Sequence, residues 1–204
     1  MLGLVHEVRR AVGPSYPVAI RINSTDKLDG GLTDDDALEA VRLLGQTSVD
    51  LIDISGGTYF PGAKAASDSS SPEPYFLEFA RRAKSITSVP VMATGRFKKR
   101  EQAVEAMANG AVDRVGLARA MVLNPRLAEV WLDEEGGDPD FPIFVSAPPS
   151  GITDWYIMRL AALGEDREAS FALDIPTAME RFEERTVLHA TRWHEKFGRR
   201  SEPG

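Results

Sequence analysis

The chain has 204 residues, 43% of them apolar and 27% charged, which is the composition of a globular protein able to bury a sizeable core. A formal net charge of −7, without a long basic stretch, argues against nucleic-acid binding. The lack of cysteine excludes disulfides, thiolate metal sites and thiol nucleophiles. Because no secretory leader pattern and no run of about 18 apolar residues is present, we expect a cytoplasmic protein that does not span a membrane.

Short apolar or β-branched runs alternate with helical patterns. After an opening helix at about 3–12, strands are predicted at 18–22, 51–55, 91–94 and 114–117, and helices follow at 33–44, 75–83 and 100–109. Thr33 with Asp36 predicts a capped helix start, and Gly110 predicts a helix end. After a short turn at 119–123, Asn124 as cap and Pro125 in the first turn predict another helix.

Alternating strands and helices predict right-handed crossovers and a parallel sheet. That sheet belongs either to an open doubly wound fold or to a (β/α)₈ barrel. Arg21, Asp53 and Ser55 place polar side chains on buried strands, which suits a barrel interior better than a sheet covered on both faces. We predict an α/β fold of four consecutive βα units of a TIM barrel, since a full barrel needs eight strands and about 250 residues.

The remaining residues have a different pattern. Residues 136–152 are rich in Pro and Gly, which predicts a connection, and helices are predicted at 153–163 and 176–197. We therefore expect three parts: a half-barrel over 1–135, the connection over 136–152, and a helical extension over 153–204.

Two strand ends carry the pattern of a phosphate site. Thr94 is followed by Gly95 and Arg96, and Gly116 is followed two residues later by Ala118 and Arg119. Small residues let backbone N–H groups approach a ligand, and a guanidinium offers paired donors to a phosphate. Barrels hold phosphates in the loops after their last two strands. In the alternative interpretation, Gly95 is a turn residue and the arginines are solvated.

Arg21 is a second candidate, because a guanidinium on the inner face of a strand stays charged and needs a partner. Asp53 on the neighbouring strand is the structural alternative to an anionic ligand. Ser55 and Gly56 close the second strand, where glycine permits a flat ligand to approach, and Tyr59 is a further candidate for the pocket lining. Residues 58–74 predict a long loop.

Other polar and aromatic residues are assigned no chemistry. The three histidines lie in predicted helices, and the three consecutive aspartates at 34–36 form a helix start instead of a metal site. No metal site is predicted. Trp155 and Tyr156 are either packing residues or lie near the barrel mouth.

Several motifs in order resemble one family. They are Val8–Gly13 with Val18–Ser24, Gly30–Thr33, Val49–Tyr59, Ala93–Phe97, and Gly116–Arg119 followed by Asn124 and Pro125. Their order and spacing resemble the C-terminal half of the NADH:flavin oxidoreductase, or Old Yellow Enzyme, family, from the opening helix to about Leu163.

The resemblance implies a TIM barrel that holds FMN at the carboxyl ends of its strands. It places Arg21 beside the pyrimidine end of the flavin, and Gly95 with Arg96 and Ala118 with Arg119 at the FMN phosphate. Ala118 stands where many members have glycine. The resemblance further implies NAD(P)H as hydride donor and an electron-poor small molecule as acceptor, and it assigns no certain catalytic residue to this half.

Three hypotheses follow. In the first, the chain is part of an FMN-dependent oxidoreductase, inactive alone, whose remaining strands come from a longer chain, a partner or a second copy. In the second, it is a non-catalytic half-barrel that binds phosphate or only assembles. In the third, it is another phosphate-binding barrel, such as a member of one of the other FMN-dependent dehydrogenase families. Exposed sheet edges would favour self-association.

Overall fold

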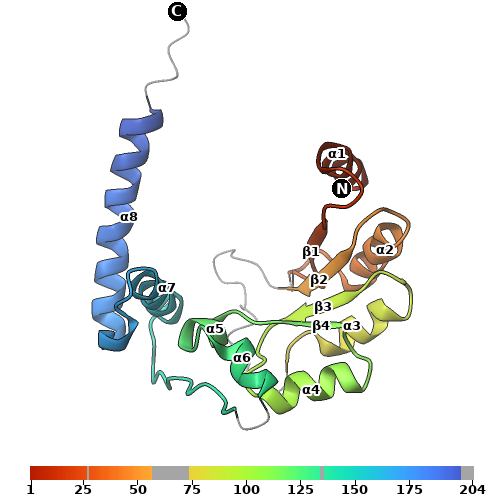
Figure 1. The fold of residues 1–204 in the computed structure, drawn as a ribbon. Helices are drawn as coiled ribbons and strands as arrows, with labels where there is room; N and C mark the ends of the chain where they lie inside the picture. Colours follow the sequence, from red (N-terminus) through yellow and green to blue (C-terminus); the bar gives the residue numbers. More distant parts are fainter. Residues whose placement is uncertain (27, 57–73, 134–135, 199–204) are drawn as a thin grey trace, which may run out of the picture. The chain divides into compact units, whose positions relative to one another are not determined.

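The computed structural model describes residues 1–26, 28–56, 74–133 and 136–198, whose helices and strands alternate in the predicted order (Figure 1). The strands are β1 (Ala19–Asn23), β2 (Leu51–Ser55), β3 (Val91–Thr94) and β4 (Arg114–Gly116). The helices are α1 (Leu2–Val12), α2 (Asp34–Leu44), α3 (Leu77–Lys84), α4 (Arg100–Ala108), α5 (Arg119–Leu123), α6 (Leu127–Leu132), α7 (Gly151–Leu163), the 3-10 turn η2 (Glu168–Ser170) and α8 (Ile175–Phe197).

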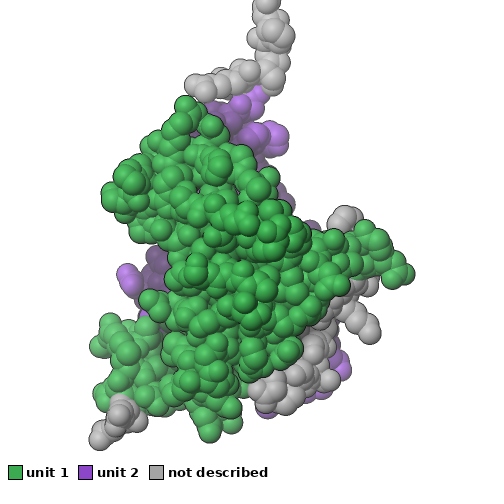
Figure 2. All heavy atoms as spheres, turned by 90° about the vertical axis from the view of Figure 1, so that its right-hand side faces the viewer, with its two compact units in different colours: residues 1–121, 126–139 green, residues 122–125, 140–204 purple. Residues whose placement is uncertain are grey.

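The chain divides into two compact units, coloured separately in Figure 2. The first unit comprises residues 1–121 and 126–139, and the second comprises 122–125 and 140–204. All four strands belong to the first unit, whereas α7 and α8 belong to the second. Within the described residues, no helix is long and apolar enough to cross a membrane.

The first unit contains one four-stranded parallel sheet with its strands in chain order. Ile52, Ile54, Val91 and Ala93 are at most 1% exposed and form the face on which α2, α3 and α4 pack. The opposite face carries the exposed side chain of Arg21. One covered face and sequential strand order are the arrangement of successive βα units in a barrel, not of a doubly wound sheet. The predicted α/β fold of four βα units is confirmed.

Most local signals act as predicted. Thr33 caps α2 through a reciprocal capping box with Asp36, and Gly110 adopts a φ of +74° just after α4. The helix start at Asn124 and Pro125 was predicted wrongly: α6 begins at Leu127, and its N-cap residue, Arg126, makes no side-chain capping bond. A proline tolerated in a first helical turn is equally tolerated in the turn before it, so the signal does not fix the boundary.

The second unit has its own aromatic core between α7 and α8. Trp155 and Tyr156 are 9% and 7% exposed and pack with the fully buried Ala178. The Trp155 ring lies edge-on to Phe144 and Phe171, and its Nε1 donates to the Leu173 carbonyl at 2.8 Å. Of the two interpretations of this aromatic pair, the structure therefore shows packing.

Candidate functional site

The predicted site residues follow the carboxyl ends of the parallel strands, which share one edge of the sheet. Asn23 pairs in register with Ser55, and Thr94 pairs with Gly116. The segments that leave these strands therefore begin side by side at that edge. Ser55 and Gly56 leave β2, Gly95 and Arg96 leave β3, and Ala118 and Arg119 follow β4.

A buried carboxylate connects three strands on the open face of the sheet. Asp53 is 4% exposed, and its Oδ2 accepts a hydrogen bond from Arg21 Nε at 2.5 Å. Its Oδ1 accepts one from Thr94 Oγ1 at 2.8 Å. The ion pair with Asp53 satisfies the charge of Arg21, yet 59% of the Arg21 side chain stays exposed. Arg21 thus has its structural partner and also presents donors to the open face.

The backbone after β3 turns through two left-handed residues. Gly95 has a φ of +140°, which is open almost only to glycine, and Arg96 has a φ of +61°. A non-glycine residue held in this region is a local strain of the kind found at binding sites. Because Gly95 has this positive φ, a glycine is required here for conformation.

Phe76 packs against glycines from two loops. A Cβ added to Gly56 would lie 2.6 Å from Phe76 Cε1, and one added to Gly95 would lie 3.1 Å from Phe76 Cε2. Phe76 itself is 6% exposed. These two glycines therefore let one aromatic ring hold the loops after β2 and β3 close together.

Three cations gather where the loops after β3 and β4 begin. The pKa of Lys98 lies below its ordinary value, chiefly because of burial and further because of the positive charges of Arg96 and Arg119. Both arginines therefore lie close enough to Lys98 for their charges to act on it. Arg96 is also held in place, since it donates to the Tyr75 hydroxyl at 2.7 Å and lies over the Tyr75 ring at 5.3 Å.

The sequence-predicted residues meet in part. Arg96 and Arg119 both act on the charge of Lys98, while Gly95 and Gly56 share a neighbour in Phe76. Arg21 reaches Thr94, the residue before Gly95, through Asp53. Ser55 takes part through its backbone, because its carbonyl accepts from the Ser24 amide at 2.7 Å. Ala118 is exposed.

Other expectations fall outside the site or outside the described residues. Residues 57–73, which include Tyr59 and most of the predicted long loop, are among those that the structure does not describe. His6 lies exposed on α1, and His189 and His194 lie exposed on α8. Within the described ranges, no three acidic or histidine side chains gather as metal ligands do.

Sequence reasoning missed Lys98 and Tyr75. Lys98 follows Gly95 by three residues, so its place in the same loop was a usable signal. Tyr75 gave no such signal, because it contacts Arg96 across 21 residues of sequence. Together with the two arginines, these residues form a cationic edge with an aromatic support, whose chemistry suits a phosphate monoester on a larger molecule.

Known proteins similar to this chain are flavin enzymes. The model of the NADH:flavin oxidoreductase / NADH oxidase family matches residues 1–131. The chain is 33% identical over 170 residues to the NADH-dependent flavin oxidoreductase iliE of Hypocrea jecorina, covering 78% of this chain and 41% of that protein. It is 35% identical over 109 residues to the NADPH dehydrogenase of Geobacillus thermodenitrificans, covering 53% of this chain and 31% of that protein. The chain thus spans less than half the length of these relatives.

Solved structures give the same picture of the fold. A 2-naphthoyl-CoA reductase superposes with a TM-score of 0.53 at 26% identity, covering 63% of this chain and 20% of that one. Histamine dehydrogenase from Rhizobium sp. 4-9 superposes with a TM-score of 0.55 at 21% identity, covering 66% of this chain and 19% of that one. With the family model matching 131 of 204 residues, and with the strand-end site in that part, the chain belongs to the NADH:flavin oxidoreductase / NADH oxidase family.

Proposed function

We propose that this chain supplies the phosphate-binding edge and one ring-facing arginine of the FMN site in an NAD(P)H-dependent flavin oxidoreductase. The observation that carries the proposal is the cluster of Arg96, Lys98 and Arg119 at the carboxyl ends of β3 and β4. The positive charges of Arg96 and Arg119 lower the pKa of Lys98, and an anion bound beside them would offset this repulsion. Membership of the family implies that this anion belongs to FMN.

The residues present fit a phosphate group. Arg96 and Arg119 offer paired N–H donors, and Lys98 adds a point charge. Gly95 permits the tight turn that precedes Arg96, and Phe76 fills the space where a side chain would stand. Ala118 is exposed, and its methyl group restricts the approach of a ligand to the backbone only on the side where that methyl group lies. The aromatic ring of Tyr75 fixes the direction of Arg96 before any ligand arrives, which lowers the ordering cost of binding.

Arg21 has the second role. When bound, FMN supplies hydride transfer from NAD(P)H to an electron-poor acceptor. The Asp53 carboxylate orients Arg21 through Nε, which leaves the terminal nitrogens of the guanidinium for an anionic ring edge. A fixed positive charge at that position stabilises a reduced, negatively charged flavin without reorganisation. This role is electrostatic, and Arg21 moves no proton.

The remainder of the enzyme would come from elsewhere. Since the chain spans 41% of its fungal relative, the other strands of the barrel would belong to a longer chain, a partner or a second copy. These strands would also supply the substrate contacts and any proton donor. We expect this chain alone to be inactive in turnover while its strand-end residues retain affinity for the phosphate end of FMN.

The test is a titration of the purified chain with FMN, followed by the absorbance and fluorescence of the flavin. We expect saturable binding that falls at least about tenfold in the double variant Arg96→Gln, Arg119→Gln, because two charge-assisted contacts are lost. The matched control is Arg10→Gln, an exposed arginine on α1 that pairs with Glu7. Equal binding by both variants would sink the proposal.

A second candidate is a half-barrel that binds phosphate or assembles without catalysis. It is favoured by the open face of the sheet, where the Arg21 side chain is 59% exposed and Arg114 is also exposed. Inorganic phosphate distinguishes the two candidates. If phosphate binds as tightly as FMN, and NAD(P)H does not bleach added flavin even when a complementing front half is supplied, the second candidate holds. Molecular mass in solution tests whether the chain assembles.

A further inference from the structure

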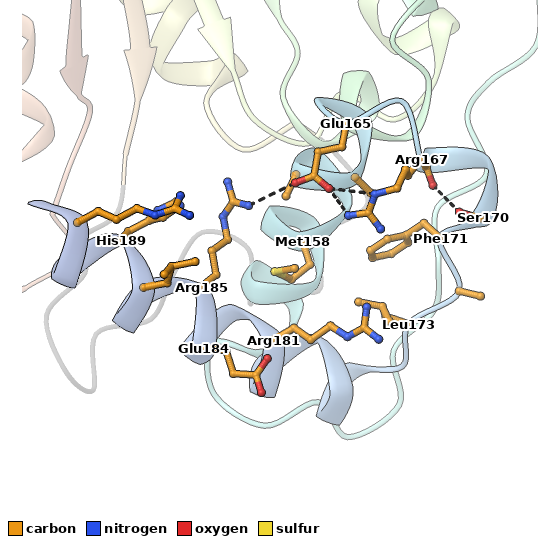
Figure 3. Close-up of a pocket in the computed structure, with 15 residues that line it drawn as sticks. Met158, Glu165, Arg167, Ser170, Phe171, Leu173, Arg181, Glu184, Arg185 and His189 are labelled. Carbon is orange, nitrogen blue, oxygen red and sulfur yellow. Dashed lines mark hydrogen bonds and ion pairs between the residues drawn. The ribbon is translucent and has the colours of Figure 1, made fainter.

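The second unit contains a cavity that the flavin site does not use. It has a volume of about 710 Å³ and lies between the end of α7, the turn containing η2, and one face of α8 (Figure 3). This volume falls within the range of small-molecule pockets, about 300–1,000 Å³. Every residue that lines it belongs to the second unit.

Arginines dominate the polar lining of the cavity. Arg181, Arg185 and Arg192 line it from α8, at spacings of four and seven residues that place them on one helix face. Along the helix axis they span roughly 16 Å at about 1.5 Å per residue. Arg167, in the turn after α7, faces them across the cavity (Figure 3).

The carboxylates in the lining do not balance this charge. Glu165 accepts hydrogen bonds from Arg167 and lies 3.9 Å from Arg185. For Arg181 and Arg192, the described part of the chain shows no hydrogen bond or ion pair. With Glu184 as the second acid of the lining, the four arginines leave a formal charge of +2, with His189 neutral, in a chain of net charge −7.

Apart from Ser170 and His189, the remaining lining is apolar. Met158, Phe171 and Leu173 are half-buried and also pack against the aromatic core, and Ala162 is 6% exposed. Their surfaces form one side of the cavity and the arginines of α8 form the other. An occupant therefore needs both an oxyanion and an apolar body.

We propose that this cavity binds an amphipathic organic anion, namely a phosphate or carboxylate carried by a flat ring or an acyl chain. Either Arg181 or Arg192 holds the oxyanion, since the side-chain donors of both are unengaged in the described residues and the two arginines lie roughly 16 Å apart along α8. The body of the ligand lies against Phe171 and Met158. The cavity shares no residue with the strand-end cluster.

Calorimetric titration with two probes tests the proposal. ADP combines a diphosphate with a flat adenine ring, and decanoate carries a carboxylate on an acyl chain, so the better probe identifies the source of the oxyanion. We expect at least one to bind saturably, at least about tenfold more weakly in the double variant Arg181→Gln, Arg192→Gln. Binding should also weaken when the ionic strength is raised from about 0.05 M, because exposed charges are screened.

The control is the double variant Arg96→Gln, Arg119→Gln, which alters the strand-end cluster and leaves the cavity intact. Probe binding retained in this control and lost in the α8 variant supports the cavity. Circular dichroism confirms that the α8 variant folds, which is expected because neither arginine holds another element.

Binding that disappears in the control but not in the α8 variant overturns the proposal, as does the failure of both probes to bind at millimolar concentration. FMN retention by the α8 variant is expected to be unchanged, so the two proposals fail independently.

Discussion

Arg21 on β1 and Asp53 on β2 lie in register, and Nε of the arginine donates to Oδ2 of the carboxylate at 2.5 Å. The other oxygen of Asp53 accepts from Thr94 Oγ1 at 2.8 Å, so the carboxylate connects β1, β2 and β3. Asp53 is 4% exposed, whereas the Arg21 side chain is 59% exposed. One buried acid therefore orients the arginine and also holds the residue that precedes Gly95.

Replacing Asp53 is expected to weaken both the fold and the site. Asp53→Asn removes the charge that pairs with Arg21 and leaves one oxygen for two donors. We expect the free energy of unfolding, measured by urea titration, to fall by about 1–3 kcal/mol. FMN retention should fall with it, because Arg21 loses its orientation.

The control for this change is Asp35→Asn. Asp35 also pairs with an arginine, at 3.3 Å from Arg82, but its side chain is 93% exposed. Exposed pairs contribute little, because water and salt screen them, so no measurable loss is expected. Equal losses of unfolding free energy in the two variants would show that the buried Asp53 network stabilises the fold no more than an exposed ion pair does.

Gly116 on β4 is expected to tolerate no side chain. An added Cβ would lie 1.9 Å from Thr94 Oγ1. Gly116→Ala must displace that hydroxyl and break its bond to Asp53, so we expect a loss of about 1–3 kcal/mol in the free energy of unfolding. Gly3→Ala on α1 is the control, since nothing lies within 4 Å of its added Cβ. Alanine there should leave stability unchanged or slightly higher. A stable Gly116→Ala chain would contradict the packing.

The sequence predicted the elements well, because short apolar runs and helical spacing are local signals. The strands at 51–55 and 91–94 match their predicted bounds. The sequence alone could not decide whether Arg21 pairs with Asp53 or faces an anionic ligand, because the strand register that places Asp53 opposite Arg21 is a property of the sheet. The structure shows that the ion pair and an exposed guanidinium coexist.

The parts that sequence reasoning missed depend on distant contacts or on weak boundary signals. Tyr75 reaches Arg96 only because α3 and β3, which lie between them in the chain, return it to the same end of the sheet. The helix start at Asn124 was wrong, because a proline does not distinguish the first helical turn from the turn before it. The role of Trp155 in the core of the second unit could not be predicted, because it depends on the position of α8, and the periodicity of the sequence does not give that position.

Lys98 is expected to destabilise the empty site and to favour anion binding. Its pKa lies below the ordinary 10.5, first because of burial and then because of Arg96 and Arg119. Between the lowered pKa and 10.5 the unfolded chain binds more protons, so stability rises with pH in that window. Below it, the cost of the charge is fully present. Lys98→Gln should therefore raise the melting temperature at neutral pH by about 1 °C without ligand.

The same variant should bind FMN and inorganic phosphate more weakly, and the difference from the parent chain should shrink as rising pH removes the proton from Lys98. Lys99→Gln is the matched control, because the neighbouring lysine is exposed like Lys98 and carries the same charge. Thermal melts with and without phosphate measure both effects. If the Lys98→Gln chain is less stable than the parent without ligand, charge repulsion at Lys98 does not lower the stability of the empty site.

Asp113 accepts a hydrogen bond from the first residue of β3 and contributes a pH-dependent part of the free energy of unfolding. Its Oδ1 accepts from Lys84 Nζ at 2.7 Å, and its Oδ2 accepts from the Val91 amide at 2.9 Å. The hydrogen bond from Lys84, followed by that from Val91, lowers the pKa of Asp113 below its ordinary value. A lowered carboxylate pKa means that the stabilisation is complete above the unfolded value and is lost as the pH falls through the folded one.

Asp113→Asn should therefore lower the free energy of unfolding by about 1–2 kcal/mol near neutral pH, since the amide keeps one acceptor but loses the charge next to Lys84. The gap between variant and parent should narrow below about pH 4, where the parent carboxyl group becomes protonated as well. Urea titrations at neutral pH and near pH 3 measure this gap. Glu78→Gln is the control, because that acid pairs with Arg81 on the surface of α3 and its side chain is 78% exposed. A gap of constant size across this pH range would mean that the Asp113 charge does not contribute, and that only the shape of its side chain matters at the start of β3.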